Sequence, residues 1–162
     1  MRNIKVAVVH CSATPEGRDL KEADIEAMHA KRFKEIGGKH VGYHHLILLD
    51  GTDIQTKDYD FIGQHVAGAN SESIGICYIG GLDKAGKKGK DTRTLAQRHA
   101  IHKRLIALKE QFPALKIRGH RDYSPDLNGD GIIEPFEFMK ECPCFDARKE
   151  YAHIENNSYK EP

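Results

Sequence analysis

The stretch IKVAVV, residues 4–9, decides the fold class of this chain. A short run of β-branched and other apolar residues predicts a buried β-strand. The run leads directly into His10 and then into polar sequence, so we expect His10 at the exposed end of that strand. The run is too short for the apolar region of a secretory signal peptide, and we expect the chain to be made in the cytoplasm.

Strands and helices alternate along the rest of the chain. Asp50-Gly51 separates two strand-like segments and predicts a hairpin, so at least one pair of strands is expected to be antiparallel. The alternation predicts an α/β fold, one domain of residues 1–162 with a mixed central β-sheet flanked by helices. The other predicted strands are residues 41–49, 53–57, 73–79 and 115–118, and the predicted helices are residues 20–35, 94–112 and 145–155.

Capping residues mark where two of the helices begin. Asp19 is the predicted N-cap of the first helix, and Thr94 with Gln97 forms a capping box for the longest one. The residues of the longest helix predicted to face the core are Leu95, Ile101, Leu105 and Leu108.

Composition and charge narrow the class of protein. With 162 residues, 39% of them hydrophobic and 30% charged, the chain is typical of a globular protein of one domain. The formal net charge of +1 gives no attraction toward nucleic acid or an anionic membrane, and no apolar run is long enough to span a bilayer. We expect a monomer whose partners include neither nucleic acid nor membrane.

The segment PDLNGDGIIEPFEF, residues 125–138, follows the pattern of a twelve-residue EF-hand calcium loop. Oxygen ligands are expected at positions 1, 3, 5, 7, 9 and 12, and glycine at position 6. These positions are filled by Asp126, Asn128, Asp130, the backbone carbonyl of Ile132, Glu134, Glu137 and Gly131. The alternative is a polar turn without an ion. Because calcium sensors use paired helix-loop-helix units and this loop is single, we interpret it as a structural clip.

Cysteine and histidine suggest a second metal. In a chain without an export signal, the four cysteines favour metal binding over disulfides. Two histidines and one cysteine at strand ends could give zinc three ligands and leave a fourth position for water, as in catalytic zinc sites. His10, His120 and Cys142 form one such trio, although the chain's ten histidines allow others.

Six segments form an ordered set of motifs: VVHCSAT (8–14), VGYHHLI (41–47), DGT (50–52), GQHVAGANSESIGIC (63–77), GHRD (119–122) and KECPCFD (140–146). In this order they resemble the zinc-dependent N-acetylmuramoyl-L-alanine amidases of the phage-lysozyme type, which share a fold with peptidoglycan recognition proteins. The resemblance covers residues 4–151 and implies a mixed sheet flanked by helices.

The resemblance implies which residues carry a reaction. His10, His120 and Cys142 match the family's zinc ligands, and Tyr43 and Lys140 match its catalytic tyrosine and lysine. The implied reaction is hydrolysis of the amide between N-acetylmuramic acid and L-alanine in peptidoglycan or muropeptides, so the chain would act on the cell wall or its fragments.

His65 matches a histidine near the cleft of the phage enzymes and is an expected substrate contact. Cys144 could compete with Cys142 for zinc, but the alignment of Cys-Pro-x-Phe-Asp favours Cys142. The short phage enzymes have only a brief loop where this chain has residues 125–138, and we expect the calcium clip to make this insertion rigid.

Two other functions compete with the enzyme. A module of the same fold could bind peptidoglycan without cutting it, but such relatives typically lack the cysteine ligand, which is present here as Cys142. Alternatively, the protein could be a calcium-regulated interaction protein, which predicts a large calcium-driven change of shape. Cys142 together with Tyr43 and Lys140 favours the enzyme.

Overall fold

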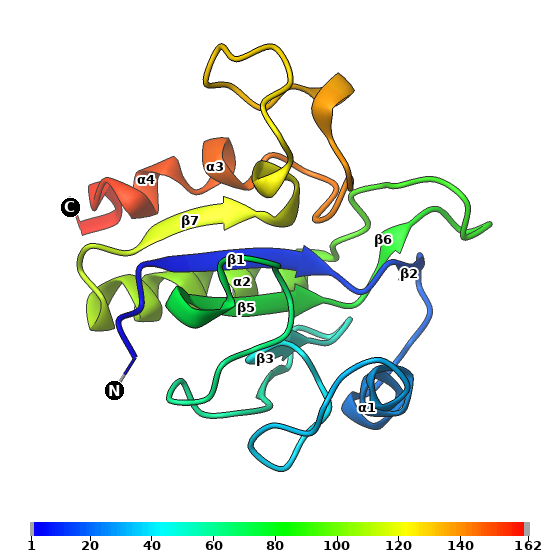
Figure 1. Ribbon diagram of the computed structural model, residues 1–162. Helices are drawn as coiled ribbons and strands as arrows, with labels where there is room; N and C mark the ends of the chain where they lie inside the picture. The colour runs from blue at the N-terminus through cyan, green and yellow to red at the C-terminus, as the bar shows by residue number, and fades with distance from the viewer. Residues whose placement is uncertain (1, 161–162) are drawn as a thin grey trace.

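The computed structural model describes residues 2–160 and contains a five-stranded central sheet (Figure 1). Its strands are β1 (Val6–Cys11), β3 (His45–Ile47), β4 (Asp53–Gln55), β5 (Ser73–Tyr78) and β7 (Lys116–Gly119), in the order β4-β3-β5-β1-β7. β1 pairs in parallel with β5 and β7, and β3 pairs in parallel with β5, whereas β3 and β4 form an antiparallel hairpin. The predicted α/β fold with a mixed sheet is confirmed.

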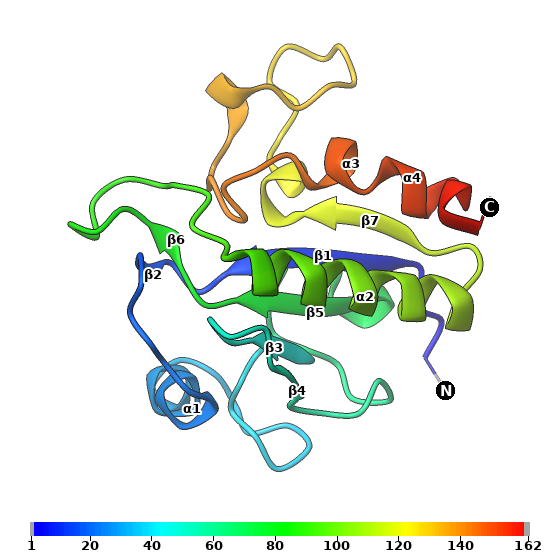
Figure 2. The ribbon, with the colours of Figure 1, turned by 180° about the vertical axis from the view of Figure 1, so that it is seen from behind.

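Helices and loops cover both faces of this sheet. Helix α2 (Leu95–Gln111) runs across one face (Figure 2), where Ile101, Leu105 and Leu108 join the main core. On the other face, Val8 packs with Val66 and Ala69 from the segment before β5. The remaining elements are β2 (Thr14–Pro15), α1 (Glu22–Ala30), β6 (Gly81–Leu82), α3 (Ala147–Glu150), α4 (Ala152–Glu155) and four 3-10 turns (Asn70–Glu72, His120–Tyr123, Pro135–Glu137 and Ser158–Lys160). Between residues 2 and 160, no helix is long and apolar enough to cross a membrane.

The ends of the helices differ from the prediction. The capping box is confirmed, since Thr94 Oγ1 accepts a hydrogen bond from the Gln97 amide at 3.1 Å. Leu95, predicted to face the core, is 70% exposed, because it is the first residue of the helix and precedes the buried stripe. Asp19 does not cap α1: its carboxylate pairs with the Lys21 ammonium at 2.8 Å, and Lys21 holds the N-cap position.

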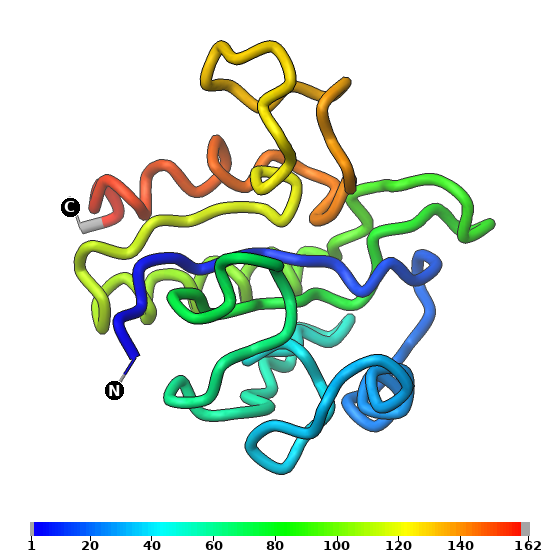
Figure 3. Tube along the Cα trace, in the orientation of Figure 1, coloured from blue at the N-terminus to red at the C-terminus, as the bar shows by residue number. Residues whose placement is uncertain are grey.

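The insertion leaves the body of the protein after the 3-10 turn His120–Tyr123 and then turns back toward the sheet (Figure 3). The Arg121 amide donates to the Cys142 carbonyl at 2.8 Å where the chain returns. It forms an arm above β7 (Figure 1) that contains the 3-10 turn Pro135–Glu137. Its base is closed by the Met139 amide, which donates to Ser124 Oγ at 3.0 Å. The arm therefore connects His120 to Cys142.

Arg93 fastens the segment after Cys142 to the rest of the fold. Its side chain is fully buried, and its guanidinium pairs with Asp91 at 2.9 Å and with Glu150 at 2.8 Å. It also donates to the Tyr151 hydroxyl at 2.9 Å and lies 3.3 Å from the centroid of the Phe145 ring. The Arg93 guanidinium thus joins the segment that precedes α2 to helix α3.

We predict that Arg93→Met lowers the free energy of unfolding by on the order of 3 kcal/mol, because it leaves Asp91 and Glu150 without their buried partner. This figure is the low end for a broken buried pair, since the two carboxylates are 24% and 35% exposed. Urea denaturation measures the change. The control is Arg98→Met, since Arg98 contacts the same carboxylates but is 43% exposed, and its loss should cost about 1 kcal/mol or less. Equal losses in the two variants would contradict the prediction.

Candidate metal centre and cleft

Three potential metal ligands meet where parallel strands end. His10 lies near the carboxyl end of β1, His120 follows β7, and Cys142 comes from the loop that returns from the insertion. One donor atom from each side chain lies within 4.8 Å of the others, and these three form the only such group of His, Cys, Asp or Glu among residues 2–160. The rings of His10 and His120 have centroids 4.8 Å apart, and Cys142 Sγ lies 3.8 Å from His10 Nδ1.

The spacing of these atoms suits zinc. Zinc bonds of roughly 2.0–2.3 Å to nitrogen and sulfur in a tetrahedron place the two ligand atoms about 3.6 Å apart. The sulfur–nitrogen distance of 3.8 Å between Cys142 and His10 is close to this value. Two imidazoles and one thiolate form a three-ligand set, which leaves the fourth position of a tetrahedron open.

Three elements hold Cys142 in place. The Cys11 amide donates to Cys142 Sγ at 3.2 Å, and the Arg121 amide donates to the Cys142 carbonyl at 2.8 Å. The Tyr78 hydroxyl donates to the carbonyl of Pro143 at 2.7 Å. Contacts with β1, β5 and the turn after β7 therefore fix this cysteine.

Both histidines of the cluster are neutral at pH 7. Burial lowers the pKa of His10 well below its ordinary value, and the nearby His65, His120 and Lys140 lower it further. Burial, followed by the charge of Lys140, lowers the pKa of His120 to about 4. A neutral imidazole has one nitrogen with a free lone pair, which is the form that binds a metal.

Tyr43 and Lys140 flank the cluster. The half-buried Tyr43 ring lies 5.1 Å from the ring of His10, centroid to centroid. Burial raises the pKa of Tyr43 well above its usual value, so its hydroxyl stays a hydrogen-bond donor. Lys140 is exposed, and its charge lowers the pKa of both candidate ligands, His10 and His120.

A cavity of about 500 Å³ opens beside these residues. Lys140, His120 and His65 line it together with Arg32, and it has no carboxylate in its wall. Sequence reasoning missed part of this wall, because some of the residues lie inside the motif of residues 63–77 without an expected role and the others lie on separate segments outside the quoted motifs. The missed residues are Arg32, Phe33, Gln64, Val66, Ala67, Asn70, Tyr123, Ser124 and Met139.

His65 lines the cavity but turns both ring nitrogens toward protein atoms. It is 8% exposed, with Nδ1 2.9 Å from His10 Nε2 and Nε2 3.2 Å from Ser73 Oγ. His44 and His45, neighbours of Tyr43, are both fully buried. His44 Nδ1 accepts a hydrogen bond from the Gly75 amide of β5 at 3.0 Å, so His44 lies behind the cleft.

The other thiols near Cys142 lie outside the cluster. Cys144 Sγ lies 3.2 Å from the Gly81 carbonyl and 4.0 Å from Cys11 Sγ. A hydrogen bond with Cys142, together with burial, raises the pKa of Cys11 to about 12. Cys77 is buried within β5, as its apolar surroundings predict.

The predicted calcium loop is wound by its own amides. The Asp126 carboxylate accepts from the amides of Gly129 and Gly131, both at 2.7 Å, and Gly131 has the positive φ, +83°, that suits the sharp-turn position. The amide of Ile132 donates to Asp130 Oδ1 at 2.8 Å. Glu137 is 2% exposed, and its carboxylate accepts from three amides, those of Leu127, Asn128 and Glu134. The carboxylates of positions 1 and 12 are thus held within the loop. The side-chain nitrogen of Asn128, Nδ2, in turn donates to the carboxylates of Asp130 and Glu134.

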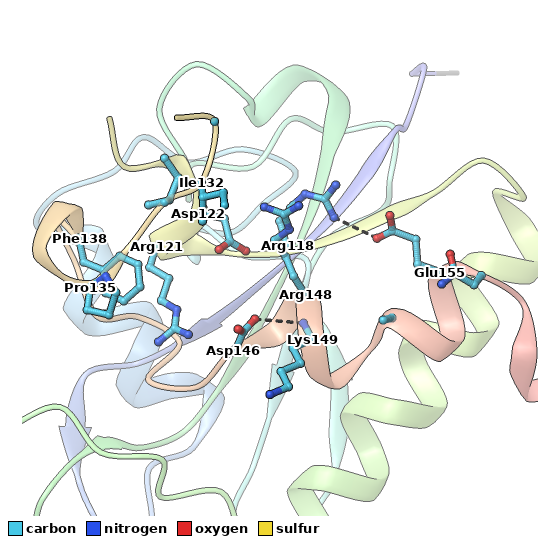
Figure 4. Close-up of a pocket in the computed structure, with 14 residues that line it drawn as sticks. Arg118, Arg121, Asp122, Ile132, Pro135, Phe138, Asp146, Arg148, Lys149 and Glu155 are labelled. Carbon is cyan, nitrogen blue, oxygen red and sulfur yellow. Dashed lines mark hydrogen bonds and ion pairs between the residues drawn. The ribbon is translucent and has the colours of Figure 1, made fainter. Parts of the chain in front are cut away.

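A second cavity, of about 560 Å³, lies between the insertion and the C-terminal helices (Figure 4). Two of its arginines are engaged by protein groups: Arg118 pairs with Glu155 at 3.0 Å, and the Arg121 guanidinium lies 4.6 Å from the Phe138 ring centroid. None of the three cluster residues lines it. The larger cavity is therefore separate from the candidate metal centre.

Comparison with known proteins identifies relatives along most of the chain. Residues 1–143 match the family described as N-acetylmuramoyl-L-alanine amidase. An uncharacterized protein of Haemophilus influenzae is 46% identical over 98 residues, which are 60% of this chain and 84% of that protein. The endolysin of Klebsiella phage KP32 is 36% identical over 141 residues, which are 87% of this chain and 81% of the endolysin.

Two solved structures show the likeness of the fold. The N-acetylmuramoyl-L-alanine amidase LysC from Clostridium intestinale has a TM-score of 0.67 at 20% identity, over 96% of this chain and 87% of that one. Peptidoglycan recognition protein-LE, solved in complex with tracheal cytotoxin, has a TM-score of 0.61 at 18% identity, over 96% of this chain and 81% of that one.

Proposed function

This chain belongs to the N-acetylmuramoyl-L-alanine amidase family and hydrolyses the amide between N-acetylmuramic acid and L-alanine in peptidoglycan, and we propose that it does so with a zinc ion held by His10, His120 and Cys142. The observation that carries this proposal is the cluster itself, in which two neutral imidazoles and one thiol bring donor atoms within 4.8 Å. The family resemblance of the sequence implies the same three ligands. Residues 1–162 would then form one amidase domain, with the insertion at residues 125–138.

The metal and the flanking residues have different tasks. Zinc, when bound, activates a water molecule for attack near pH 7 and polarises a carbonyl group. Tyr43, protonated in this environment, hydrogen-bonds the attacking water or the substrate and assists transfer of a proton toward the departing L-alanine nitrogen. Lys140, exposed at the cleft, stabilises the negative oxygen that develops on the amide carbon.

The cleft is suited to an anionic substrate. Its wall includes the cations Arg32 and Lys140 and no carboxylate. The peptide stem of a muropeptide carries carboxylates, so positive charge on the wall would attract it. A protein of the same fold, peptidoglycan recognition protein-LE, was solved with a monomeric diaminopimelic acid-type peptidoglycan, which supports a ligand of this class.

The insertion would bind a structural calcium ion. Asp126, Asn128, Asp130, the Ile132 carbonyl and Glu137 are the proposed ligands, and the supporting observations are the fit to the twelve-residue pattern and the positive φ of Gly131. Calcium would turn the Asn128 side chain so that its oxygen, in place of its nitrogen, faces the carboxylates. The ion would offset the repulsion between acidic groups and stiffen the arm that carries Lys140 and Cys142.

We predict that the purified protein holds about one zinc ion per chain and releases L-alanine-linked peptide from muropeptides, and that Cys142→Ser loses both. The reason is that a hydroxyl is a far weaker zinc ligand than a thiolate. Metal analysis and chromatography of the products measure the two effects. Cys144→Ser, in the same loop but outside the cluster, is the matched control and should keep both properties. A wild-type protein that takes up no zinc after reconstitution would overturn the proposed mechanism.

For Lys140→Met, we predict a fall in kcat of about 10²–10³ with unchanged zinc content, because a donor to the developing oxyanion is removed. Steady-state kinetics on a defined muropeptide checks this. Lys149→Met is the control, since Lys149 lines the second cavity and should be neutral. Near-normal activity of Lys140→Met would assign this lysine to the solvated surface.

Calcium should raise the melting temperature without changing activity at a temperature where the calcium-free protein is folded. Calcium at 100 times its Kd would add about 2.7 kcal/mol, or roughly 5–10 °C for a chain of this size. Scanning calorimetry in calcium and in chelator measures the shift, and Glu137→Gln should abolish it. Glu141→Gln, outside the loop, is the control and should retain it. Strong reversible activation by calcium would instead favour a regulatory loop.

A further inference from the structure

We infer that His65 is a positioning residue that fixes the tautomer and the ring orientation of His10, so that His10 Nδ1 presents its lone pair to the metal. This inference rests on the proposed zinc site. It assigns His65 a task behind the metal in place of the substrate contact expected from the sequence.

A chain of three side chains runs from the cluster into the sheet. Cys142 Sγ faces His10 Nδ1 at 3.8 Å, and the opposite nitrogen of that ring, Nε2, lies 2.9 Å from His65 Nδ1. His65 Nε2 in turn lies 3.2 Å from Ser73 Oγ, at the start of β5. The rings of His10 and His65 are perpendicular, with centroids 5.0 Å apart. Each imidazole therefore has one nitrogen toward the cluster and one toward the next residue of the chain.

The positions of the protons follow from this order. A neutral imidazole has one N–H donor and one acceptor nitrogen. If the His10 proton lies on Nε2, it is donated to His65 Nδ1, and His65 donates its own proton from Nε2 to Ser73. His10 Nδ1 is then free to bind a metal. In the reverse order His10 would carry its proton on Nδ1, directed at the donor atoms of the cluster, and could not be a ligand.

The fold reserves space for the His65 ring at two glycines. A Cβ on Gly75 would lie 2.8 Å from His65 Cγ, and a Cβ on Gly63 would lie 2.6 Å from His65 Cδ2. Neither glycine has a positive φ, so backbone conformation does not require glycine at these positions. Gly75 instead lets the ring lie against the backbone of β5, and Gly63 lets it lie against the segment that leads into His65. The ring is confined by packing, which a positioning residue requires.

Outer hydrogen bonds of this kind normally hold a metal-binding histidine in one tautomer and make it a better ligand. The usual partner is a carboxylate, a backbone carbonyl or water, whereas here it is a second imidazole. An imidazole acceptor provides the hydrogen bond without placing another negative charge beside the thiolate of Cys142. The net charge of the loaded site therefore stays positive.

The test compares zinc affinity in full-length variants, measured by competition with a chromophoric chelator. His65→Leu, which removes the acceptor, should weaken zinc binding about 10–100-fold. His65→Asn places an acceptor oxygen near the position of Nδ1 and should bind zinc close to wild type. His44→Leu is the matched control: it removes another buried histidine, 5.9 Å from the His65 ring, and should lower stability but leave zinc affinity unchanged.

A second measurement does not depend on how the variants fold. Nitrogen-15 NMR of histidine-labelled wild-type protein at neutral pH, before zinc is added, should show His10 protonated on Nε2 and bare on Nδ1. A proton on Nδ1, or a folded His65→Leu that binds zinc as tightly as wild type, overturns the inference. A wild-type protein that binds no zinc would refute the proposed metal site instead, so the two failures are distinguishable.

Discussion

Parallel pairing of β1 with β7 is the constraint on which the site depends. Parallel strands end at the same edge of a sheet, and this places His10 and His120, far apart in the sequence, with their rings 4.8 Å apart. β5, on the other side of β1, adds the Tyr78 hydroxyl that holds the Pro143 carbonyl next to Cys142. Three adjacent parallel strands therefore supply two candidate ligands and an anchor for the third.

Local sequence signals predicted the interior of the fold better than its ends. The runs that became β1 and β5 are rich in Val and Ile, and the Thr94 capping box is a local hydrogen-bond pattern, so each could be recognised without tertiary information. The first helix was predicted to reach residue 35 but ends at Ala30, because the Glu26 carboxylate accepts from the amides of His40 and Val41 and draws the following chain back. That contact spans 14 to 15 residues and leaves no periodic signal.

The candidate site likewise contains residues that could be predicted from the sequence and residues that could not. The cluster of His10, His120 and Cys142 could be predicted because each residue lies in a recognisable motif, and the motifs occur in a known order. The inward orientation of His65 could not, since it depends on Ser73 and on space left by two glycines from different segments. No sequence motif predicted the contacts of Arg93 either. Its guanidinium carbon lies 3.3 Å from the ring centroid of Phe145, which is three residues after Cys142.

The two candidate functional residues on the returning loop, Lys140 and Cys142, are held by different contacts, and this bears on what calcium could control. Cys142 and Pro143 are fixed by Cys11, Arg121 and Tyr78, all of which lie outside the insertion. The approach to Lys140 instead comes from the arm, whose base is closed at Met139 by Ser124. A loosened arm would therefore affect the position of the Lys140 ammonium more than that of the thiol. Because a flexible ammonium in an open cleft can still reach a developing oxyanion, stiffening by calcium would stabilise the fold while adding little to the rate.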